Sequence, residues 1–596
     1  MTIQRFLSPH RLILWLLPWV TAVSLLAVFA WIETRALIAE AERLLIAGEG
    51  SAAEQRLAGL ARLPGLRAEA RAGLELALAL GGAGTVADGK AADRADLDGD
   101  GGFRAFDLAL ITRAAFDRGD FGAVLRLDAL ATSRGLPPQP WITLAARIEQ
   151  GAPPETAKKT EARAALMAPP ARSVLARRVR AHLDSPQQGI VLRSRDGRRL
   201  GVLSDGAVQA APGLDARWLP NQLTELEELL PHAGSIRTSL DLELMEAAAG
   251  AFGRFRGSIV LVDPWTGEIL AAVSDRKTRR RDRGTPALEQ FREPASISKL
   301  ITTAAYLRQG LDPEARLAGM ACRGHESYAG ERLYCPVIAG RLLGLDRAMA
   351  VSCNVAFAEL AEDMGRGPLL EELRRFGFDR PLGPFSGGRI VTPYGDERQL
   401  ADMAIGLEAT ELTPLHAALV AATVATGGDL VEPTLLRGVD GRLGLHPRTL
   451  RDPSVTRVLE PEHAETLRRS MVAVAQRGTG QRMRTHGFPV AMKTGTASHP
   501  QYGFHVNYVG FGPLPEARVA FCVRITHQAT SRRVRAAATE VTRRLFRRLR
   551  TVSRQRGWQT PSRSRLTESA QAPQRLAERR DARAPGVVGE SARAGR

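Results

Sequence analysis

Ser296 and Lys299 form a pair whose residue types and spacing could support a reaction. They lie three residues apart in EPASISKLITTAAYL, where an apolar run follows the lysine. On a helix this separation places the hydroxyl and the amine on one face. An apolar environment disfavours the charged ammonium, so a buried lysine can accept the proton of a serine that attacks a carbonyl group. The pair predicts a serine nucleophile with a lysine as its base.

A second pair, Ser274 and Lys277, has the same spacing in a different setting. It ends a strand-like segment and lies in SDRKTRRRDR, where charged neighbours favour a solvated turn and a protonated lysine. Only six of the 82 basic residues are lysine, and arginine cannot act as a base because it stays protonated. A lysine retained in an apolar setting therefore indicates that Lys299 supplies an exchangeable amine.

Two further motifs follow in the chain. Ser352 and Asn354 flank Cys353 in an S-x-N motif, and residues 493–496 (KTGT) open a strand-like segment. Asparagine occurs only three times, so an accidental S-x-N motif between the other two is improbable. S-x-x-K, S-x-N and K-T-G in this order are the motifs of penicillin-binding proteins and serine β-lactamases. The chain resembles the transpeptidase domain of penicillin-binding proteins, and the resemblance extends to VDPWTGEILAAVS, ELTPLHAALVAATVATGG and GTGQRM.

The resemblance implies an α/β (α+β) domain of the transpeptidase and β-lactamase type over residues 236–549, with a five-stranded antiparallel sheet flanked by helices. It implies that Ser296 attacks the penultimate D-alanine of a peptidoglycan stem peptide, and that the amine of a second strand then takes the acyl group. Lys299 would be the base, Ser352 a proton relay, and Asn354 a hydrogen-bond partner of the lysine and the substrate. The implied activity is that of a peptidoglycan D,D-transpeptidase that binds penicillin covalently and needs no cofactor.

The KTGT segment would bind the substrate. Lys493, Thr494 and Thr496 would hold the terminal carboxylate of the stem peptide or its β-lactam mimic. Gly495 would leave the cleft edge open, because a side chain there would obstruct a substrate lying along the strand. The backbone N–H groups of Ser296 and Thr496 would stabilise the tetrahedral intermediate.

Other uses of the same site remain open. A D,D-carboxypeptidase or a β-lactamase would pass the acyl group to water, although no E-x-x-L-N-like deacylating segment separates Asn354 from Lys493. A noncatalytic cell-wall assembly protein would keep the pocket without the reaction. The E-D-x-x-F-x-x-H pattern of a glycosyltransferase is absent, so a monofunctional protein is expected. The acceptor amine, the subclass and a role in division or elongation stay open.

Strand-like and helical segments surround the motifs. GSIVLV and EILAAV are nearly continuous in apolar residues and are joined by DPWTG, which predicts a hairpin of buried strands. VNYVGFGP and ARVAFCVRI predict two later strands, and the amphipathic VRAAATEVTRRLFRRL predicts the last helix of the domain. Because lysine already supplies the base, His499 and His505 are interpreted as rim or turn residues.

Residues 12–32 are expected to span a membrane. They contain no charged side chain over 21 positions, which is long enough for a helix to cross a bilayer. Arg5 and Arg11 precede the segment, so the positive-inside rule leaves residues 1–11 in the cytoplasm and the catalytic domain in the periplasm. The expected location is the bacterial inner membrane, with one signal anchor. A cleaved signal peptide is the alternative, although no convincing cleavage site follows.

Residues 33–149 are predicted to form an all-α module resembling helical repeats, because apolar residues recur at helical spacing. Such a module could recruit cell-wall assembly proteins. Within it, residues 96–107 (DLDGDGGFRAFD) have the spacing of a dockerin or EF-hand calcium loop, and a solvated acidic turn is the alternative. The candidate ligands of this structural calcium are Asp96, Asp98, Asp100 and Asp107.

The other segments are predicted from composition. Residues 150–183 are Pro-containing and are interpreted as a linker, and residues 184–235 as a small β-containing connector. Residues 531–596 hold 18 arginines and 5 acidic residues and supply most of the net charge of +18. We interpret residues 550–596 as a basic disordered tail, and nucleic acid is not an expected partner.

Four cysteines are too few for a disulfide scaffold, and none of their spacings resembles a zinc site. Cys322 and Cys335 could close a loop in an oxidising compartment, and this pairing stays open.

Overall fold

The computed structural model describes most of residues 36–558. The gaps are residues 59–72, 75, 78–79, 81–107, 134–138, 154–155, 158–160, 162–173, 185–188, 276, 279–283, 392–393, 444–447, 450–452, 500–502 and 529. The predicted membrane span at 12–32, the predicted calcium loop at 96–107 and the tail from 559 onwards lie outside the described residues. Among the helices that the structure describes, none combines the length and the apolar character that a bilayer span requires.

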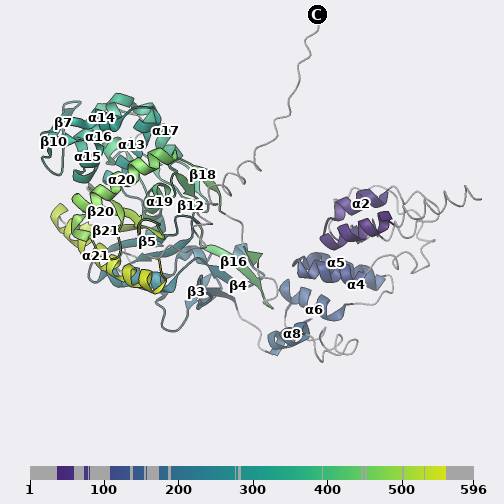
Figure 1. Cartoon of the computed structure of the whole chain (residues 1–596). Helices are drawn as coiled ribbons and strands as arrows, with labels where there is room; N and C mark the ends of the chain where they lie inside the picture. The colour runs from purple at the N-terminus through teal and green to yellow at the C-terminus, as the bar shows by residue number, and fades with distance from the viewer. Residues whose placement is uncertain are drawn as a thin grey trace, which may run out of the picture. The chain divides into compact units, whose positions relative to one another are not determined.

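The chain divides into two compact units, drawn in Figure 1. The first unit comprises residues 1–191, 227–236 and 438–449, and the second comprises residues 192–226, 237–437 and 450–596. The helices described in the first unit include α2 (Gly50–Ala58), α4 (Leu108–Asp117), α5 (Phe121–Ser133), α6 (Pro140–Glu149) and α8 (Val174–Asp184).

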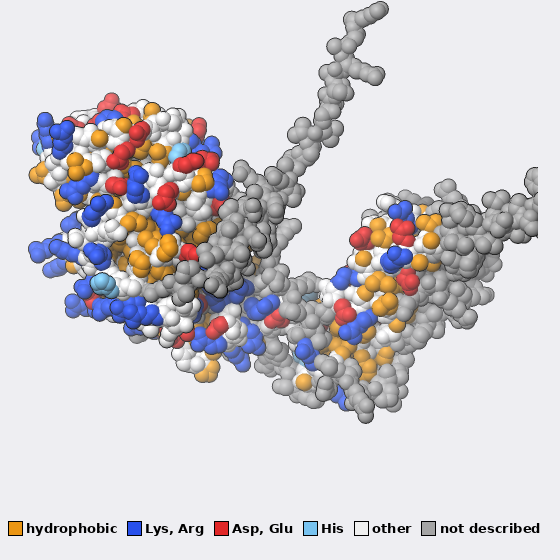
Figure 2. Space-filling model, in the orientation of Figure 1, with side chains coloured by type: hydrophobic (Ala, Val, Ile, Leu, Met, Phe, Trp, Pro, Cys, Tyr) orange, Lys and Arg blue, Asp and Glu red, His pale blue; other side chains and the backbone are white. Residues whose placement is uncertain are grey.

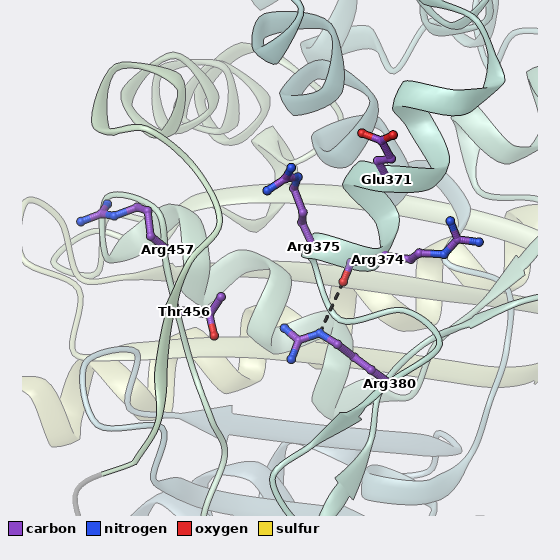
Figure 3. Close-up of a pocket in the computed structure, with 6 residues that line it drawn as sticks. All are labelled: Glu371, Arg374, Arg375, Arg380, Thr456 and Arg457. Carbon is purple, nitrogen blue, oxygen red and sulfur yellow. Dashed lines mark hydrogen bonds between the residues drawn. The ribbon is translucent and has the colours of Figure 1, made fainter. Parts of the chain in front are cut away.

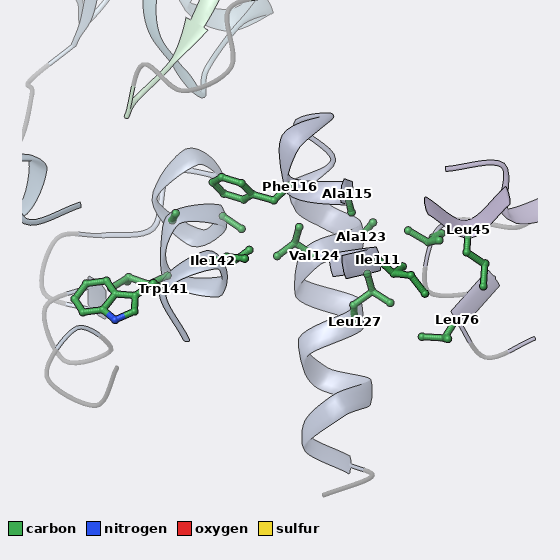
Figure 4. Packing of buried hydrophobic residues seen from close by; sticks show 14 of the residues in the cluster. Leu45, Leu76, Ile111, Ala115, Phe116, Ala123, Val124, Leu127, Trp141 and Ile142 are labelled. Carbon is green, nitrogen blue, oxygen red and sulfur yellow. The ribbon is translucent and has the colours of Figure 1, made fainter. Parts of the chain in front are cut away.

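Apolar side chains spaced three and four residues apart hold the helices of the first unit together. Ile111 and Ala115 share the buried face of α4, and Val124 and Leu127 share that of α5 (Figure 4). Trp141 lies in the same cluster at the start of α6. These residues supply the periodicity from which the helical module is predicted.

A six-stranded sheet has the order β17-β16-β4-β1-β2-β3. Its strands are β1 (Ile190–Arg193), β2 (Arg199–Ser204), β3 (Ala207–Ala210), β4 (Ala233–Thr238), β16 (Leu436–Gly441) and β17 (Arg448–Thr449). The neighbouring strands β1 and β2 flank Asp196-Gly197, the turn of the predicted connector.

The second unit is built on a five-stranded antiparallel sheet of order β19-β20-β21-β5-β6, which confirms the predicted sheet. Its strands are β5 (Gly257–Val262), β6 (Ile269–Ser274), β19 (Ala491–His499), β20 (Gly503–Gly512) and β21 (Val519–Gln528). Every residue of β5 and β6 is buried, as expected for strands covered on both faces. Helices α10 (Leu242–Phe252) and α21 (Ser531–Gln555) pack together on one face, and α19 (Pro414–Ala425) packs on the other. Figure 1 labels α19 and α21.

Helix α13 (Ser298–Arg308) is enclosed by other helices. Its residues from Ser298 to Tyr306 are all buried, because α16 (Asn354–Met364), α17 (Arg366–Arg375), α18 (Glu397–Ile405) and α20 (Pro461–Arg477) pack around it. Because these residues have no solvent-facing side, their sequence has no amphipathic pattern. Ser, Thr and Lys are therefore interspersed among apolar residues in this helix. Two small two-stranded sheets follow it in the chain: β7 (Ala318–Cys322) with β10 (Gly340–Leu343), and the hairpin of β8 (His325–Tyr328) with β9 (Glu331–Tyr334).

Helix α21 continues to Gln555, beyond residue 549, where the sequence places the end of the domain. Leu549 and Val552 extend its buried face. Just beyond it, Arg556 pairs with the Asp241 carboxylate, which caps the first turn of α10. Exposed arginines cover the outer face of α21, and Figure 2 shows basic side chains gathered over this helix.

Candidate active site

A short turn carries Ser296. It is the 3-10 turn η6 (Ala295–Ile297), which runs directly into α13. Ala295 has a φ of 53°, in the left-handed region that residues other than glycine rarely adopt. Its N–H donates to the Gly406 carbonyl at 2.7 Å. Ser296 is partly exposed, whereas Lys299, within the first turn of the helix, is fully buried.

The amines of Lys299 and Lys493, which belong to two different motifs, both contact the hydroxyl of Ser352. Lys299 Nζ donates to Asn354 Oδ1 at 2.7 Å and to the Ser352 carbonyl at 2.8 Å, and it lies 3.2 Å from Ser352 Oγ. Lys493 Nζ lies 2.9 Å from the same hydroxyl and donates to the Thr494 carbonyl at 2.8 Å. Neither lysine side chain is exposed. The fold thus brings together residues from all three motifs.

Burial determines the protonation of the two lysines. Removal from water lowers the pKa of Lys299 to about 7. Burial lowers the pKa of Lys493 well below its usual value, and the nearby charge of Lys299 lowers it further. Ser352 Oγ can accept a hydrogen bond from a protonated amine and donate its own hydrogen to a neutral one. The arrangement can hold a neutral amine near pH 7 and relay a proton through Ser352.

The backbone at Ser352 positions the S-x-N motif. This residue ends α15 (Leu345–Val351) in the left-handed conformation, with φ 58° and ψ 44°, and α16 begins at Asn354. The change of direction lets the hydroxyl at 352 and the amide at 354 reach Lys299 together. A left-handed residue other than glycine costs about 1 kcal/mol. The hydrogen bonds that these two groups accept from the buried amine offset that strain.

The KTGT segment lies in β19, beside the nucleophile turn. A Cβ atom at Gly495 would lie 3.0 Å from Ala295 Cβ and 3.1 Å from Ser296 N, closer than most real Cβ contacts. The missing side chain therefore lets the strand approach the turn itself, whereas the sequence had indicated a role in leaving room for the substrate. The Thr494 hydroxyl is hydrogen-bonded to the Thr479 hydroxyl, a partner that sequence reasoning missed although it lies in the GTGQRM segment.

The other candidate residues from the sequence differ in their burial. Ser274 is buried in β6 and bonded to the Ser258 hydroxyl at 2.8 Å, whereas Lys277 is exposed. His499 lies near the end of β19 and is partly exposed. The rim interpretation is wrong for His505, which is buried in β20, where burial above all lowers its pKa to about 3. The apolar strand residues next to His505 were the signal in the sequence that could have indicated its burial.

Three cysteines converge beside the S-x-N motif. All described cysteines are free thiols, and the sulfur atoms of Cys322, Cys335 and Cys353 lie within 4.8 Å of one another. Thiolates at such distances suit a soft metal ion such as Zn²⁺, so these residues could hold one, although their spacing in the sequence predicted no metal site. Cys335 Sγ lies 3.6 Å from Cys353 Sγ, and a hydrogen bond from Cys353 lowers the pKa of the Cys335 thiol.

Mild oxidation is expected to join Cys335 to Cys353 in preference to Cys322, because the sulfur atoms of the first two residues are already 3.6 Å apart. Mass spectrometry of a nonreducing digest measures which peptides are linked, and Cys335→Ser provides the unlinked control. A Cys322–Cys335 link as the main product would contradict the expectation.

A cavity of about 460 Å³ lies away from the three motifs. Figure 3 shows its lining, which comes from the end of α17, the loop after it and β18 (Val455–Arg457). The lining residues are Glu371, Arg374, Arg375, Arg380, Thr456 and Arg457. Arg457 is paired with the Asp429 carboxylate at 3.0 Å. No residue of the three motifs lines this cavity.

Comparison with known proteins agrees with this geometry. A family model described as the penicillin binding protein transpeptidase domain matches residues 257–549. The peptidoglycan D,D-transpeptidase PbpA of Mycolicibacterium smegmatis is 31% identical over 337 residues, which cover 50% of this chain and 68% of the relative. PbpA of Mycobacterium tuberculosis is 29% identical over 342 residues, with 50% and 68% covered.

Solved structures show the same fold. The crystal structure of PBPA from M. tuberculosis matches with a TM-score of 0.51 at 22% identity, covering 61% of this chain and 99% of that one. Apo penicillin-binding protein 3 from the same organism matches with a TM-score of 0.53 at 20% identity, covering 62% and 97%.

Proposed function

Because this chain belongs to the family of penicillin-binding proteins with a transpeptidase domain, we propose that it is a peptidoglycan D,D-transpeptidase. It would cross-link stem peptides through an acyl-serine intermediate and bind penicillin covalently. The observation that carries the proposal is the buried contact of Lys299 and Lys493 with one hydroxyl, that of Ser352, next to the turn of Ser296.

In the acylation step, Ser296 Oγ attacks the carbonyl carbon of the penultimate D-alanine and its proton passes to the neutral amine of Lys299. The backbone N–H groups of Ser296 and Thr496 stabilise the oxyanion. When the tetrahedral intermediate collapses, the C–N bond breaks and the leaving D-alanine amine takes a proton through Ser352. The amine of a second stem peptide then attacks the ester and regenerates the serine.

Substrate binding involves the KTGT strand. Lys493 is fully buried and its amine already contacts Ser352 and Thr494, so we assign it an electrostatic role behind the carboxylate of the substrate. Thr496 is partly exposed, whereas Thr494 is buried and its hydroxyl is bonded to that of Thr479. Both hydroxyls would bond that carboxylate directly. Asn354 would orient Lys299 and bond the peptide backbone.

Other roles are proposed from the sequence. Residues 12–32 would anchor the chain in the inner membrane, with the catalytic domain in the periplasm. The helical module would recruit cell-wall assembly proteins. Asp96, Asp98, Asp100 and Asp107 would bind a structural calcium ion.

The proposal is tested by incubating the protein with a fluorescent penicillin and locating the label by mass spectrometry. The expected result is a stable adduct on the peptide that contains Ser296, and release of D-alanine with cross-linked product when a stem peptide and an amine acceptor are supplied. Folded protein without an adduct would overturn the proposal. A labile adduct with hydrolysed product would assign the site to a carboxypeptidase or β-lactamase.

Gly495→Ala is expected to slow penicillin acylation by about tenfold or more, because the new methyl group presses on Ala295 and on the N–H of Ser296. The melting temperature should change by only a few degrees, since the strand pairing is retained. Stopped-flow fluorescence measures the rate. Ser498→Ala, at an exposed position of the same strand, is the control, and an unchanged rate in Gly495→Ala would contradict the expectation.

A further inference from the structure

A row of small and polar residues crosses the five-stranded sheet. Gly495, Asn507, Arg524, Ser258 and Ser274 lie directly opposite one another on β19, β20, β21, β5 and β6. All five are buried, although the flanking positions of the central strands are mostly apolar. Burying polar groups destabilises a protein unless each finds a partner. The partners of Arg524 and Asn507 therefore indicate what this row does.

Arg524 has no exposed surface and donates three hydrogen bonds. Its Nη1 donates to the Gln290 carbonyl at 2.6 Å, and its Nη2 donates to the Leu412 carbonyl at 3.0 Å. Its Nε donates to Asn507 Oδ1 at 2.6 Å. The guanidinium is thus bonded to neutral oxygens, two of which are backbone carbonyls of segments that approach the nucleophile turn.

Asn507 connects Arg524 to the turn that carries Ser296. Its Nδ2 donates to the Glu293 carbonyl at 2.9 Å and to the Pro294 carbonyl at 3.2 Å. These carbonyls immediately precede Ala295, the residue with a left-handed φ, and Ser296. Asn507 also lies opposite Gly495 on the neighbouring strand. One side chain therefore contacts the chain on which the position of the nucleophile depends.

The chemistry of the two side chains fixes the orientation of the amide. A guanidinium only donates hydrogen bonds, so it selects the oxygen of the Asn507 amide. The NH₂ group must then face the two carbonyls, which only accept. A flipped amide would place oxygen against oxygen at both contacts.

We propose that Asn507 and Arg524 are positioning residues for acylation, in which the guanidinium orients the amide and the amide holds the turn that presents Ser296. This inference rests on the proposed acyl-serine function. The same contacts set the distance between the Ser296 N–H and β19, and hence the geometry in which the oxyanion is bonded.

The inference is tested with Asn507→Asp in the full chain. Aspartate has nearly the same shape and keeps an acceptor for Arg524, but its ionised form has no donor for the carbonyls of Glu293 and Pro294. Stopped-flow acylation by penicillin at several concentrations separates the apparent binding constant from the first-order acylation rate. We expect the acylation rate to fall by about tenfold to a hundredfold. The binding constant should change less than about threefold, since the KTGT hydroxyls are untouched.

Ser258→Ala is the matched control, because Ser258 is buried in the same row but its hydroxyl bonds Ser274. If the unaltered protein forms no adduct, the proposed function fails before the inference is reached. If it reacts and Asn507→Asp reacts equally fast, or if Ser258→Ala loses as much, the positioning role is overturned. Should Asn507→Asp not fold, Arg524→Lys decides by the same measurement, because lysine keeps the charge but loses the guanidinium fork that bonds three acceptors.

Discussion

Ser296→Ala is expected to abolish the covalent adduct with fluorescent penicillin, with no label above background at any time. The substitution removes the only atom through which the proposed ester can form. The side chain is partly exposed and its hydroxyl lies outside the buried lysine contacts, so the fold should be preserved. Labelled protein is measured after gel electrophoresis, and circular dichroism checks folding.

The control for this variant is Ser274→Ala, at the other serine with S-x-x-K spacing, which is bonded to Ser258. It should label like the unaltered protein. Persistent labelling of Ser296→Ala would place the nucleophile elsewhere and remove the basis of the proposed function.

Lys299→Met should lower the acylation rate by about a thousandfold, the range expected when a general base is removed. Methionine has a similar volume and no charge, so the variant should fold. Its melting temperature should fall by several degrees, because the acceptors at Ser352 and Asn354 lose their donor. Lys277→Met, at the exposed lysine, is the control and should react normally. A rate within tenfold of the unaltered protein would show that Lys299 is not the base.

The pH profile of the unaltered protein tests the same assignment. Burial lowers the pKa of Lys299 to about 7, so the neutral base becomes populated and acylation accelerates as the pH rises through about 7. The free lysine titrates near 10.4, so the unfolded state binds more protons than the folded state between these values. Stability therefore rises with pH across that window, and this contribution is lost as the pH falls through about 7. Lys299→Met should lack this pH-dependent contribution to stability.

Local patterns were sufficient to predict the reacting groups. Ser296 and Lys299 lie within one helical turn, and β5 and β6 are joined by a short hairpin, so their relation depends on few residues. Order and spacing of the motifs then placed Ser352 and the KTGT segment in the same site.

Distant contacts were not predictable in this way. Arg524 lies in an apolar strand, AFCVRI, and its partners are backbone carbonyls at Gln290 and Leu412, which carry no signal in the sequence. Cys335 lies close to Cys353 because of how a small hairpin sheet folds. From the separation along the chain, Cys322 had been considered as the partner of Cys335. The continuation of α21 past 549 depends on Leu549, Val552 and the contact of Arg556 with Asp241.

The strand order has a consequence for how the protein is made. Strand β5 pairs with β21, and the indole of Trp265, in the turn after β5, donates to the Ala517 carbonyl, 252 positions later in the chain. During synthesis the β5–β6 hairpin therefore emerges long before β21, with the backbone N–H and C=O groups on the free edge of β5 unpaired. Contacts of such sequence separation make folding slow. The nascent domain would need protection from aggregation until its last strands leave the ribosome or the translocation channel.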